Sequence, residues 1–451
     1  MVADIIFQPL HFKNLAVKNR VIRSNISGRF DNFDGSGSNT RLNWEERFAR
    51  GGVGAILSSF VSVSIRGRIM PNYATIDSDD KIPFWREVGK RVHAHDCRYI
   101  LQLSHSGRQQ DVPGVENQFR KPLSATDRME TFDGFVPKMM SREDIQQTVY
   151  DFGQGARRAR EAGLDGVETH SANGYLFTQF LSSGINNRKD EYGGSLRNRA
   201  RFLLEVVAEI RKQVGDDFHL QVKINGNDYG NAVFPWEGKG NTVEDTIQIC
   251  GWLEEAGVDG IHVSGGSSFP HPFNPPGGFP IDWALRTFDV MLSSGAFTFQ
   301  RYLLFRYRPL RPLFNFFWNR NKPDTVEGIN ADAARQIKRH LKVPVLVTGG
   351  FQTASIIRRY INEGYCDAVS IARALVANND LVKIFASGKD LPDRPCTHCN
   401  KCLVNAIKNP LGCYELSRFD GDYDRMIKEV MSVFHPSAFE AVASGTGQGY
   451  D

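Results

Sequence analysis

A short pattern recurs along the chain: a helical segment ends in glycine, and an aspartate then leads into a short apolar strand. The pattern covers residues 161–168 and 255–262 and, more loosely, residues 363–370. Glycine is common just past the end of a helix. Short apolar strands that repeatedly follow helices are typical of parallel βα units. The pattern therefore predicts a parallel α/β fold.

Eight apolar segments fit the strands of such a fold, which is the number in a (β/α)8 TIM barrel. An open doubly wound sheet is the alternative, but no GxGxxG motif follows the first strand. The predicted strands are about residues 21–25, 54–60, 98–103, 166–170, 218–224, 260–264, 344–348 and 368–372. The predicted helices between them include 39–50, 83–95, 141–162, 242–256, 330–340 and 353–363. Ser141 with Asp144 resembles a capping box, and Ser195 is the predicted N-cap of a further helix.

The chain has 451 residues, which is enough for one barrel with insertions or for two ordinary domains. We assign residues 1–395 to the barrel, with an insertion at 265–328 after the sixth strand. A cysteine-rich segment (396–415) and a C-terminal tail (416–451) follow. The tail is expected to be partly disordered because its end is rich in glycine and serine.

Composition excludes several classes of protein. A net charge of +4 and the lack of a recognisable motif argue against a nucleic-acid partner. The first residues do not resemble a signal peptide, and no apolar run reaches the roughly 18 residues of a membrane span. A cytoplasmic protein is expected.

Cys396, Cys399, Cys402 and Cys413 lie within eighteen residues. Without an export signal, this grouping favours a metal or cluster site over disulfides.

The insertion has two parts with different compositions. The first is rich in proline and glycine and predicts a loop. Residues 297–318 then carry nine aromatic residues and four arginines without an acidic residue. This segment is either a lid packed over the barrel or a basic surface that contacts a membrane or a partner. Pro309 and Pro312 break any long helix, and the lid is the preferred interpretation.

The fourth predicted strand ends in a group of polar residues, His170, Asn173 and Tyr175. Barrels of this class place their chemistry at the carboxyl ends of the strands. His170 and Asn173 each offer an N–H donor, and two donors converging on one oxygen would polarise a carbonyl and stabilise an enolate. The phenol of Tyr175 would then serve as a general acid.

Two further strand ends predict a phosphate-bearing ligand. Barrels commonly bind phosphate on the loops after strands seven and eight. Glycines let backbone N–H groups approach an anion, and the helix that begins at Thr353 adds a favourable dipole. The predicted phosphate residues are Gly349, Gly350, Phe351, Ala372 and Arg373.

Other polar residues lie on predicted strands. Lys223 would need an anion if it faced into the barrel, whereas on the outer face it would pair with a carboxylate. Gln102 ends the third strand and is either a ligand contact or a satisfied core amide. Ser24, Asn25 and Ser27 end the first strand with small side chains that would let a planar ligand lie close.

These residues resemble the old yellow enzyme, or NADH:flavin oxidoreductase, family of FMN-dependent ene-reductases. The likeness is carried by HSANGY (170–175) and DEYGGS (190–195), and it spans about residues 1–390. It implies FMN at the barrel mouth, with the phosphate at Gly349, Gly350 and Arg373. The flavin ring would contact Gln102 and Lys223. NADH or NADPH would be the co-substrate.

The resemblance also implies the reaction. NAD(P)H reduces FMN, and an α,β-unsaturated carbonyl compound then binds through its oxygen to His170 and Asn173. Hydride passes from flavin N5 to the β-carbon, and Tyr175 protonates the α-carbon. The implied function is the reduction of activated C=C bonds.

The four grouped cysteines (396, 399, 402 and 413) carry a second resemblance, to the cluster motif of 2,4-dienoyl-CoA reductase and trimethylamine dehydrogenase. Those relatives hold a 4Fe–4S cluster that passes electrons to FMN. An iron–sulfur flavoprotein that receives electrons through this motif is therefore an alternative function. Zinc binding or reduced thiols remain open for the same residues. An alternative of another class is a membrane- or partner-docking electron-carrier module. The sequence leaves the natural substrate and the oligomeric state open.

Overall fold

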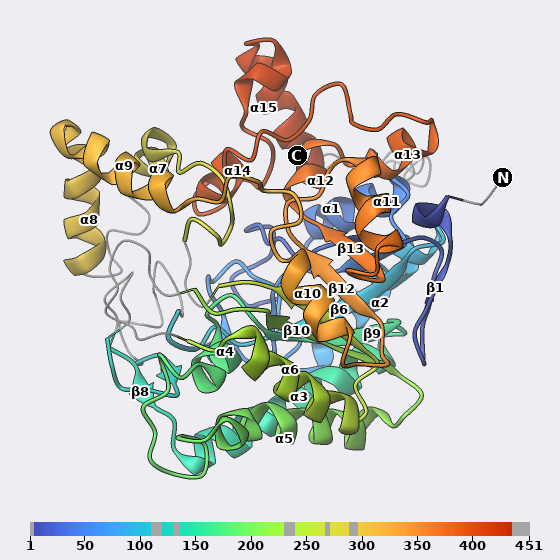
Figure 1. Cartoon of the computed structure of the whole chain (residues 1–451), viewed down its shortest axis with the longest axis vertical. Helices are drawn as coiled ribbons and strands as arrows, with labels where there is room; N and C mark the ends of the chain where they lie inside the picture. The colour runs from blue at the N-terminus through green and yellow to red at the C-terminus, as the bar shows by residue number, and fades with distance from the viewer. Residues whose placement is uncertain are drawn as a thin grey trace, which may run out of the picture.

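The computed structural model describes residues 4–109, 120–129, 136–229, 240–266, 271–287 and 296–434. Its centre is a barrel of eight parallel strands in the order β4-β3-β13-β12-β11-β10-β9-β6, closed where β4 pairs with β6 (Figure 1). This closure confirms the predicted TIM barrel and excludes the open sheet. The barrel strands are β3 (Val21–Arg23), β4 (Ala55–Leu57), β6 (Arg98–Ser104), β9 (Gly166–Ser171), β10 (His219–Asn225), β11 (Gly260–Ser264), β12 (Val345–Thr348) and β13 (Ala368–Ile371).

Helices cover the outside of the barrel between successive strands, and the predicted helices are confirmed to within two residues at each end. Ser141 and Asp144 form a reciprocal capping box, and the Ser195 hydroxyl accepts from the N–H of Asn198 at 3.3 Å. The covering helices are α1 (Asn39–Arg50), α2 (Ile82–His93), α3 (Arg142–Glu161), α5 (Leu196–Val214), α6 (Val243–Glu255), α10 (Ala331–Lys338), α11 (Ala354–Asn362), α12 (Arg373–Ala377) and α13 (Leu381–Ala386). The short helix α4 (Leu176–Leu181) precedes α5.

The aspartate of the recurring sequence pattern joins neighbouring strands at the amino end of the barrel. Each aspartate accepts a hydrogen bond through a carboxylate oxygen from a backbone N–H of the preceding barrel strand, and its own N–H donates to the carbonyl of that same residue. The carboxylate bonds are Asp165 from Tyr99 (2.7 Å), Asp259 from Leu220 (2.9 Å) and Asp367 from Val345 (2.8 Å). A side chain from the end of a covering helix meets each carboxylate: His93, Arg211 and Lys338. The pattern therefore marks strand pairing as well as helix ends.

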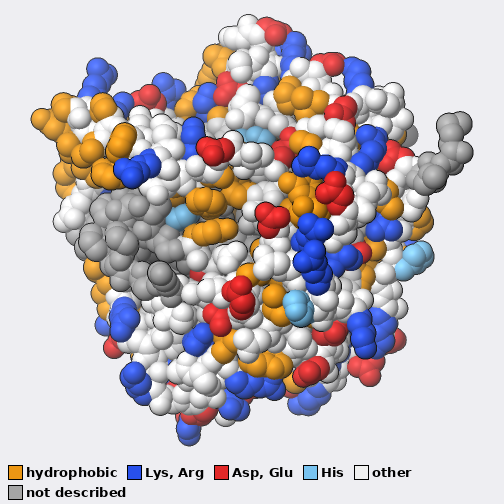
Figure 2. Space-filling model, in the orientation of Figure 1, with side chains coloured by type: hydrophobic (Ala, Val, Ile, Leu, Met, Phe, Trp, Pro, Cys, Tyr) orange, Lys and Arg blue, Asp and Glu red, His pale blue; other side chains and the backbone are white. Residues whose placement is uncertain are grey.

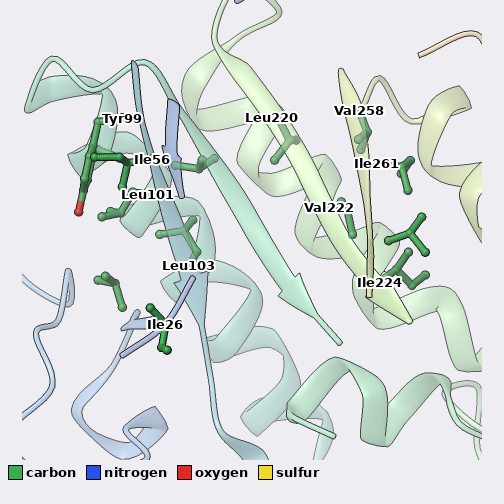
Figure 3. Close-up of a cluster of buried hydrophobic side chains, with 14 of the residues drawn as sticks. Ile26, Ile56, Tyr99, Leu101, Leu103, Leu220, Val222, Ile224, Val258 and Ile261 are labelled. Atoms are coloured by element: carbon green, nitrogen blue, oxygen red, sulfur yellow. The ribbon is translucent and has the colours of Figure 1, made fainter. Parts of the chain in front are cut away.

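Residues along the strands alternate between an apolar outer face and a more polar inner face, as a strand period of two requires. On β10, Leu220, Val222 and Ile224 pack outward in the apolar layer between strands and helices (Figure 3). Gln221 and Lys223 lie between them and face the barrel interior, where they meet Glu168 and Asn25. The same alternation on β6 leaves Gln102 inside.

A hairpin closes the amino end of the barrel. It consists of β1 (Leu10–His11) and β2 (Ala16–Val17), paired antiparallel. Phe12 and Leu15 from this hairpin join a cluster with strand residues such as Leu57 and Leu346. Water is thus kept out of the barrel from below, and the carboxyl ends of the strands remain as the accessible side.

The described residues of the insertion between β11 and α10 include three α-helices. They are α7 (Ile281–Thr287), α8 (Ala296–Arg306) and α9 (Arg311–Asn321). Pro309 lies in the short turn between α8 and α9, and Pro312 lies in the first turn of α9, so these prolines separate the helices as predicted. No helix among the described residues is long and apolar enough to cross a membrane.

Beyond the barrel, the structure describes the chain as far as residue 434. The segment contains α14 (Lys401–Asn405) and α15 (Tyr423–Met431), and α15 packs through Met426 and Val430 on Tyr414 and Phe419. The predicted disorder of the Gly/Ser-rich end falls on residues 435–451, which lie outside the described residues. The domain boundaries stay a prediction.

Replacing Asp259 by alanine should destabilise the barrel. Asp259 is 2% exposed, and the substitution leaves the buried N–H of Leu220 without its acceptor and removes the anion that pairs with Arg211. We expect the free energy of unfolding to fall by about 3 kcal/mol, measured by chemical denaturation. The matched control is Asp217→Ala, which removes an exposed partner of Arg160 and should leave the unfolding midpoint unchanged. Equal stability of Asp259→Ala and wild type would contradict the assigned role.

Candidate active site

A cavity of about 330 Å³ opens at the carboxyl ends of the barrel strands. Its walls come from the ends of β3, β9, β10, β12 and β13, from the insertion, and from the cysteine segment. The structure therefore brings together residues up to 383 positions apart in the sequence, from Ser24 to Ile407. The predicted site residues that line it are Ser24, Asn25, Ser27, His170, Asn173, Tyr175, Lys223, Gly349, Gly350, Phe351, Ala372 and Arg373.

One wall of the cavity is an aromatic group that contains the predicted general acid. The ring of Tyr175 lies 4.9 Å from that of His170 and 5.1 Å from that of Phe60, centroid to centroid. Burial raises the pKa of Tyr175, so the phenol keeps its proton at neutral pH. Burial and the charge of Lys223 lower the pKa of His170 well below its usual value, so the imidazole is neutral. The two groups can donate hydrogen bonds without carrying charge.

His170 and Asn173 line the same cavity, but their donors face different partners. The Nδ1 atom of His170 is buried and has no hydrogen-bond partner among the described residues. The amide nitrogen of Asn173 donates to Gly265 and Asn274, both at 3.1 Å. Asn173 has a φ of 62°, in the left-handed region, and this turn directs its side chain to the loop after β11. The predicted convergence of the two donors on one oxygen stays a prediction.

Lys223 faces the cavity and not the helix layer. Its ammonium donates to Oδ1 of Asn25 at 2.6 Å, so the ends of β10 and β3 are joined across the barrel. Burial lowers the pKa of Lys223 to about 8, although the carboxylate of Glu168 acts in the opposite direction. The lysine therefore changes charge close to physiological pH, where an anionic ligand would favour the protonated form.

Below the cavity, the barrel interior holds a polar layer centred on Glu168. Its carboxylate accepts from Nε2 of Gln102 at 2.7 Å and from Nε2 of Gln221 at 2.5 Å. Nδ1 of His262 lies 2.8 Å from the same carboxylate, and Nε2 of His262 lies 2.6 Å from the hydroxyl of Ser370. Because a carboxylate only accepts, His262 carries its proton on Nδ1 and accepts from Ser370 on Nε2. Gln102 thus belongs to this layer, and it is not among the described residues that line the cavity.

Sequence reasoning missed this polar layer, although a signal was present. Glu168, His262 and Ser370 each stand three positions after the aspartate of the recurring pattern. A buried polar residue on a barrel strand is costly unless its partners lie nearby. His262 lies within hydrogen-bond distance of both Glu168 and Ser370, so these equivalent positions of the repeats share one layer.

The predicted phosphate loops also line the cavity, and part of the helix N-terminus beside them already has a partner. The first N–H groups around α11 do not face the cavity, because those of Gln352 and Thr353 donate to the carboxylate of Glu327 at 2.9 and 3.0 Å. The carboxylate of Glu327 therefore already accepts hydrogen bonds from the N-terminus of α11. Gly350, with a φ of 73°, and Arg373 line the cavity and remain the predicted anion-binding residues.

The cysteine segment forms part of the same cavity. Asn400 accepts from the guanidinium of Arg373, and Nε2 of His398 lies 3.0 Å from the carbonyl of Gly350. The segment residues that line the cavity are His398, Asn400, Leu403, Val404, Ala406 and Ile407. The sequence placed the cysteines near the ligand only through the second resemblance, and no spacing pattern pointed to His398 or Asn400.

The four grouped thiols surround one region beside Arg373. Cys396, Cys399 and Cys402 act electrostatically on the guanidinium, and Cys413 acts on Cys396 and Cys402. None of these four cysteines forms a disulfide among the described residues. Within the described part of the chain, no three Cys, His, Asp or Glu side chains are close enough to hold a single metal ion.

The cavity residues fit FMN. Lys223 and Arg373 supply two cations, and neither makes an ion pair with a described carboxylate, which suits an anionic ligand. A Cβ atom added at Gly350 would lie 2.5 Å from the side chain of Val326, and the positive φ would strain any other residue there. Glycine therefore leaves the backbone at this position exposed to the cavity without a side chain. The unpartnered Nδ1 of His170 adds a buried polar atom for a ligand to satisfy.

Comparison with known proteins identifies the relatives of this chain. Residues 5–271 match the NADH:flavin oxidoreductase / NADH oxidase family. The chain belongs to this family. This membership confirms the family predicted from HSANGY and the phosphate loops, and the use of FMN and NAD(P)H follows at the level of the family.

Individual relatives of this flavin oxidoreductase include proteins of two lengths. This chain is 28% identical over 416 residues to the NADH oxidase of Thermoanaerobacter brockii. The aligned region covers 89% of this chain and 56% of the relative. This chain is 35% identical over 294 residues to the NADPH dehydrogenase of Halalkalibacterium halodurans. That aligned region covers 64% of this chain and 82% of the relative. The chain thus spans little more than half of the longer relative.

A solved structure shares the fold. The complex of 2-naphthoyl-CoA reductase with 2-naphthoyl-CoA superposes with a TM-score of 0.73 at 22% identity, covering 93% of this chain and 58% of the other. At this identity the likeness establishes the barrel and its additions, and no more.

The charge of Lys223 should make FMN binding depend on pH. Because its pKa is about 8, the lysine is protonated below that pH and loses its attraction for an anionic ligand above it. We expect the affinity for FMN, measured by quenching of flavin fluorescence, to fall as the pH rises from 7 to 9.

Two variants test the source of this dependence. Glu168→Gln removes the negative neighbour that supports the charged lysine, so the fall in affinity should move to lower pH. Lys223→Met should bind FMN more weakly and with a flat profile. A flat wild-type profile would contradict the role of Lys223.

Proposed function

We propose that this chain is an FMN-dependent NAD(P)H oxidoreductase that reduces the activated C=C bond of α,β-unsaturated carbonyl compounds. The observation that carries the proposal is the contact between neutral His170 and protonated Tyr175 on one wall of a cavity that fits FMN. A hydrogen-bond donor and a proton donor side by side are what addition across a polarised alkene requires. FMN, when bound, supplies the hydride transfer.

The residues of the chain divide the remaining work. His170 is the donor for the substrate carbonyl oxygen, because its ring is neutral and its Nδ1 has no partner among the described residues. Tyr175 delivers a proton from its phenol oxygen to the α-carbon. Asn173 holds the loop after β11 through Gly265 and Asn274, and we propose that it turns to the carbonyl oxygen when substrate binds.

The reaction has two half-reactions that separate the role of Tyr175. In Tyr175→Phe, alkene reduction should slow by about 100-fold or more, because the proton donor is lost. Oxidation of NAD(P)H by the bound flavin should continue at the wild-type rate, because it needs no phenol. Stopped-flow absorbance of the flavin, with each substrate mixed separately, measures both steps.

Tyr73 provides a competing assignment, since it lines the same cavity and burial raises the pKa of Tyr73 to about 12. Tyr73→Phe should retain most of the alkene half-reaction. If Tyr73→Phe loses that half-reaction and Tyr175→Phe keeps it, Tyr175 is not the donor. A protein without a flavin spectrum after reconstitution with FMN would contradict the whole proposal.

The cysteine segment supports a second candidate, an iron–sulfur flavoprotein that receives electrons through Cys396, Cys399, Cys402 and Cys413. The supporting observation is that the segment carrying these thiols forms a wall of the cavity and contacts Arg373 and Gly350. Electrons that entered at the thiols would reach a flavin in this cavity directly. The two candidates differ in the electron donor and share the site.

Metal analysis separates the two candidates. If the second candidate is correct, anaerobically purified protein should contain about four iron and four sulfide per chain. Its absorption spectrum should then show a broad shoulder beside the flavin bands. Cys402→Ala should lose the iron and the shoulder while retaining the flavin, and Cys250→Ala, a buried thiol in α6, is the matched control. Zinc in place of iron, or iron retained in Cys402→Ala, would rule out the cluster.

A further inference from the structure

The insertion helices α8 and α9 expose an apolar surface that the oxidoreductase site does not use. Sixteen large hydrophobic side chains are exposed among the described residues, and eight of them lie in the nineteen positions from 299 to 317. Such a concentration marks a contact surface, because single exposed hydrophobic residues are normally scattered. We call the eight residues the outer face: Phe299, Leu303, Leu304, Tyr307, Leu310, Leu313, Phe316 and Phe317.

The outer face is not a poorly packed part of the core, because the two helices already have a buried side. Phe305 and Trp318 are 6% and 4% exposed and pack with Phe279 and Phe314 at centroid distances of 4.9–5.8 Å. The indole N–H of Trp318 donates to the carbonyl of Gly277 at 3.0 Å. Trp318 also lines the cavity, so the inner side forms part of its wall, and the lid stays a prediction. The outer face is a second, separate surface.

The charge of this region selects its partner. Residues 296–322 contain five arginines and one lysine and no acidic residue. Arg311 pairs with Asp282 at 2.8 Å, whereas Arg306, Arg308, Arg320 and Lys322 make no ion pair with any described carboxylate. A second copy of this chain would bring like charges together. A surface of anionic headgroups would satisfy the cations while the hydrocarbon takes up the phenylalanines and leucines.

The position of the helices agrees with such a contact. The two helices project from one side of the barrel, and Figure 2 shows hydrophobic side chains gathered there with basic side chains beside them. A projecting surface enters a bilayer interface more readily than it fits a flat protein face. We propose that the chain docks peripherally on anionic membranes through the outer face and its surrounding arginines.

Vesicle co-sedimentation of the full chain tests this proposal without any enzyme substrate. The probes are vesicles of phosphatidylcholine alone and vesicles of phosphatidylcholine with an equal part of phosphatidylglycerol. We expect binding to the anionic vesicles only, and weaker binding as salt rises. Phe316→Gln/Phe317→Gln should weaken binding about tenfold or more, and Arg308→Gln/Arg320→Gln about 30-fold.

Matched controls come from exposed residues elsewhere. Phe33 is 62% exposed, compared with 57% for Phe316, and Arg50 is an exposed arginine at the end of α1. Phe33→Gln/Arg50→Gln should bind as wild type does. The thermal midpoint of each variant reports folding, and it is independent of the catalytic proposal.

Three results would overturn the proposal. One is no sedimentation with anionic vesicles at low salt, and another is equal binding by Phe316→Gln/Phe317→Gln and wild type. The third is a lipid-free dimer, seen by sedimentation velocity, that the same double variant dissolves. That result would assign the outer face to contact between copies.

Discussion

The buried carboxylate of Glu168 is the interaction on which the cavity depends. It accepts hydrogen bonds from Gln102, Gln221 and His262, which stand on three other strands of the barrel. A carboxylate in this setting is stable only when such donors satisfy it, so the layer holds its strands in one mutual arrangement. Its charge also supports the ammonium of Lys223 directly above. The floor of the cavity is therefore both a structural layer and an electrostatic one.

The walls above this floor come from parts of the chain with separate origins. The barrel contributes the His170 and Tyr175 wall and the glycine loop, whereas the insertion contributes Trp318 and the cysteine segment contributes Asn400. These additions join at Arg373, whose guanidinium donates to Pro276 of the insertion and to Asn400. One cation thus links the insertion and the cysteine segment to the end of the barrel strand β13. A substitution in any of these parts is expected to change the binding of the same ligand.

Much of the barrel was predictable because its signals are local. Eight strands, their covering helices and the capping Ser141 and Ser195 follow from periodicity and from residue types at helix ends. Twelve predicted site residues line the cavity because the carboxyl ends of parallel strands meet at one side of a barrel. The use of the α11 N-terminus was not predictable, because Glu327 reaches it from a separate loop. The partners of Asn173 were missed for the same reason, since Asn274 lies in the insertion.

The sequence alone determined the parallel barrel, the family and the types of residue at the strand ends, because these depend on spacing along the chain. The tertiary structure decided which way Lys223 faces, that Gln102 belongs to the interior layer, and that Glu168, His262 and Ser370 meet. It also decided that Trp318 of α9 lines the cavity while α8 and α9 expose an apolar, basic surface on their other side. These outcomes depend on closure of the ring and on packing between distant segments, which no local pattern encodes.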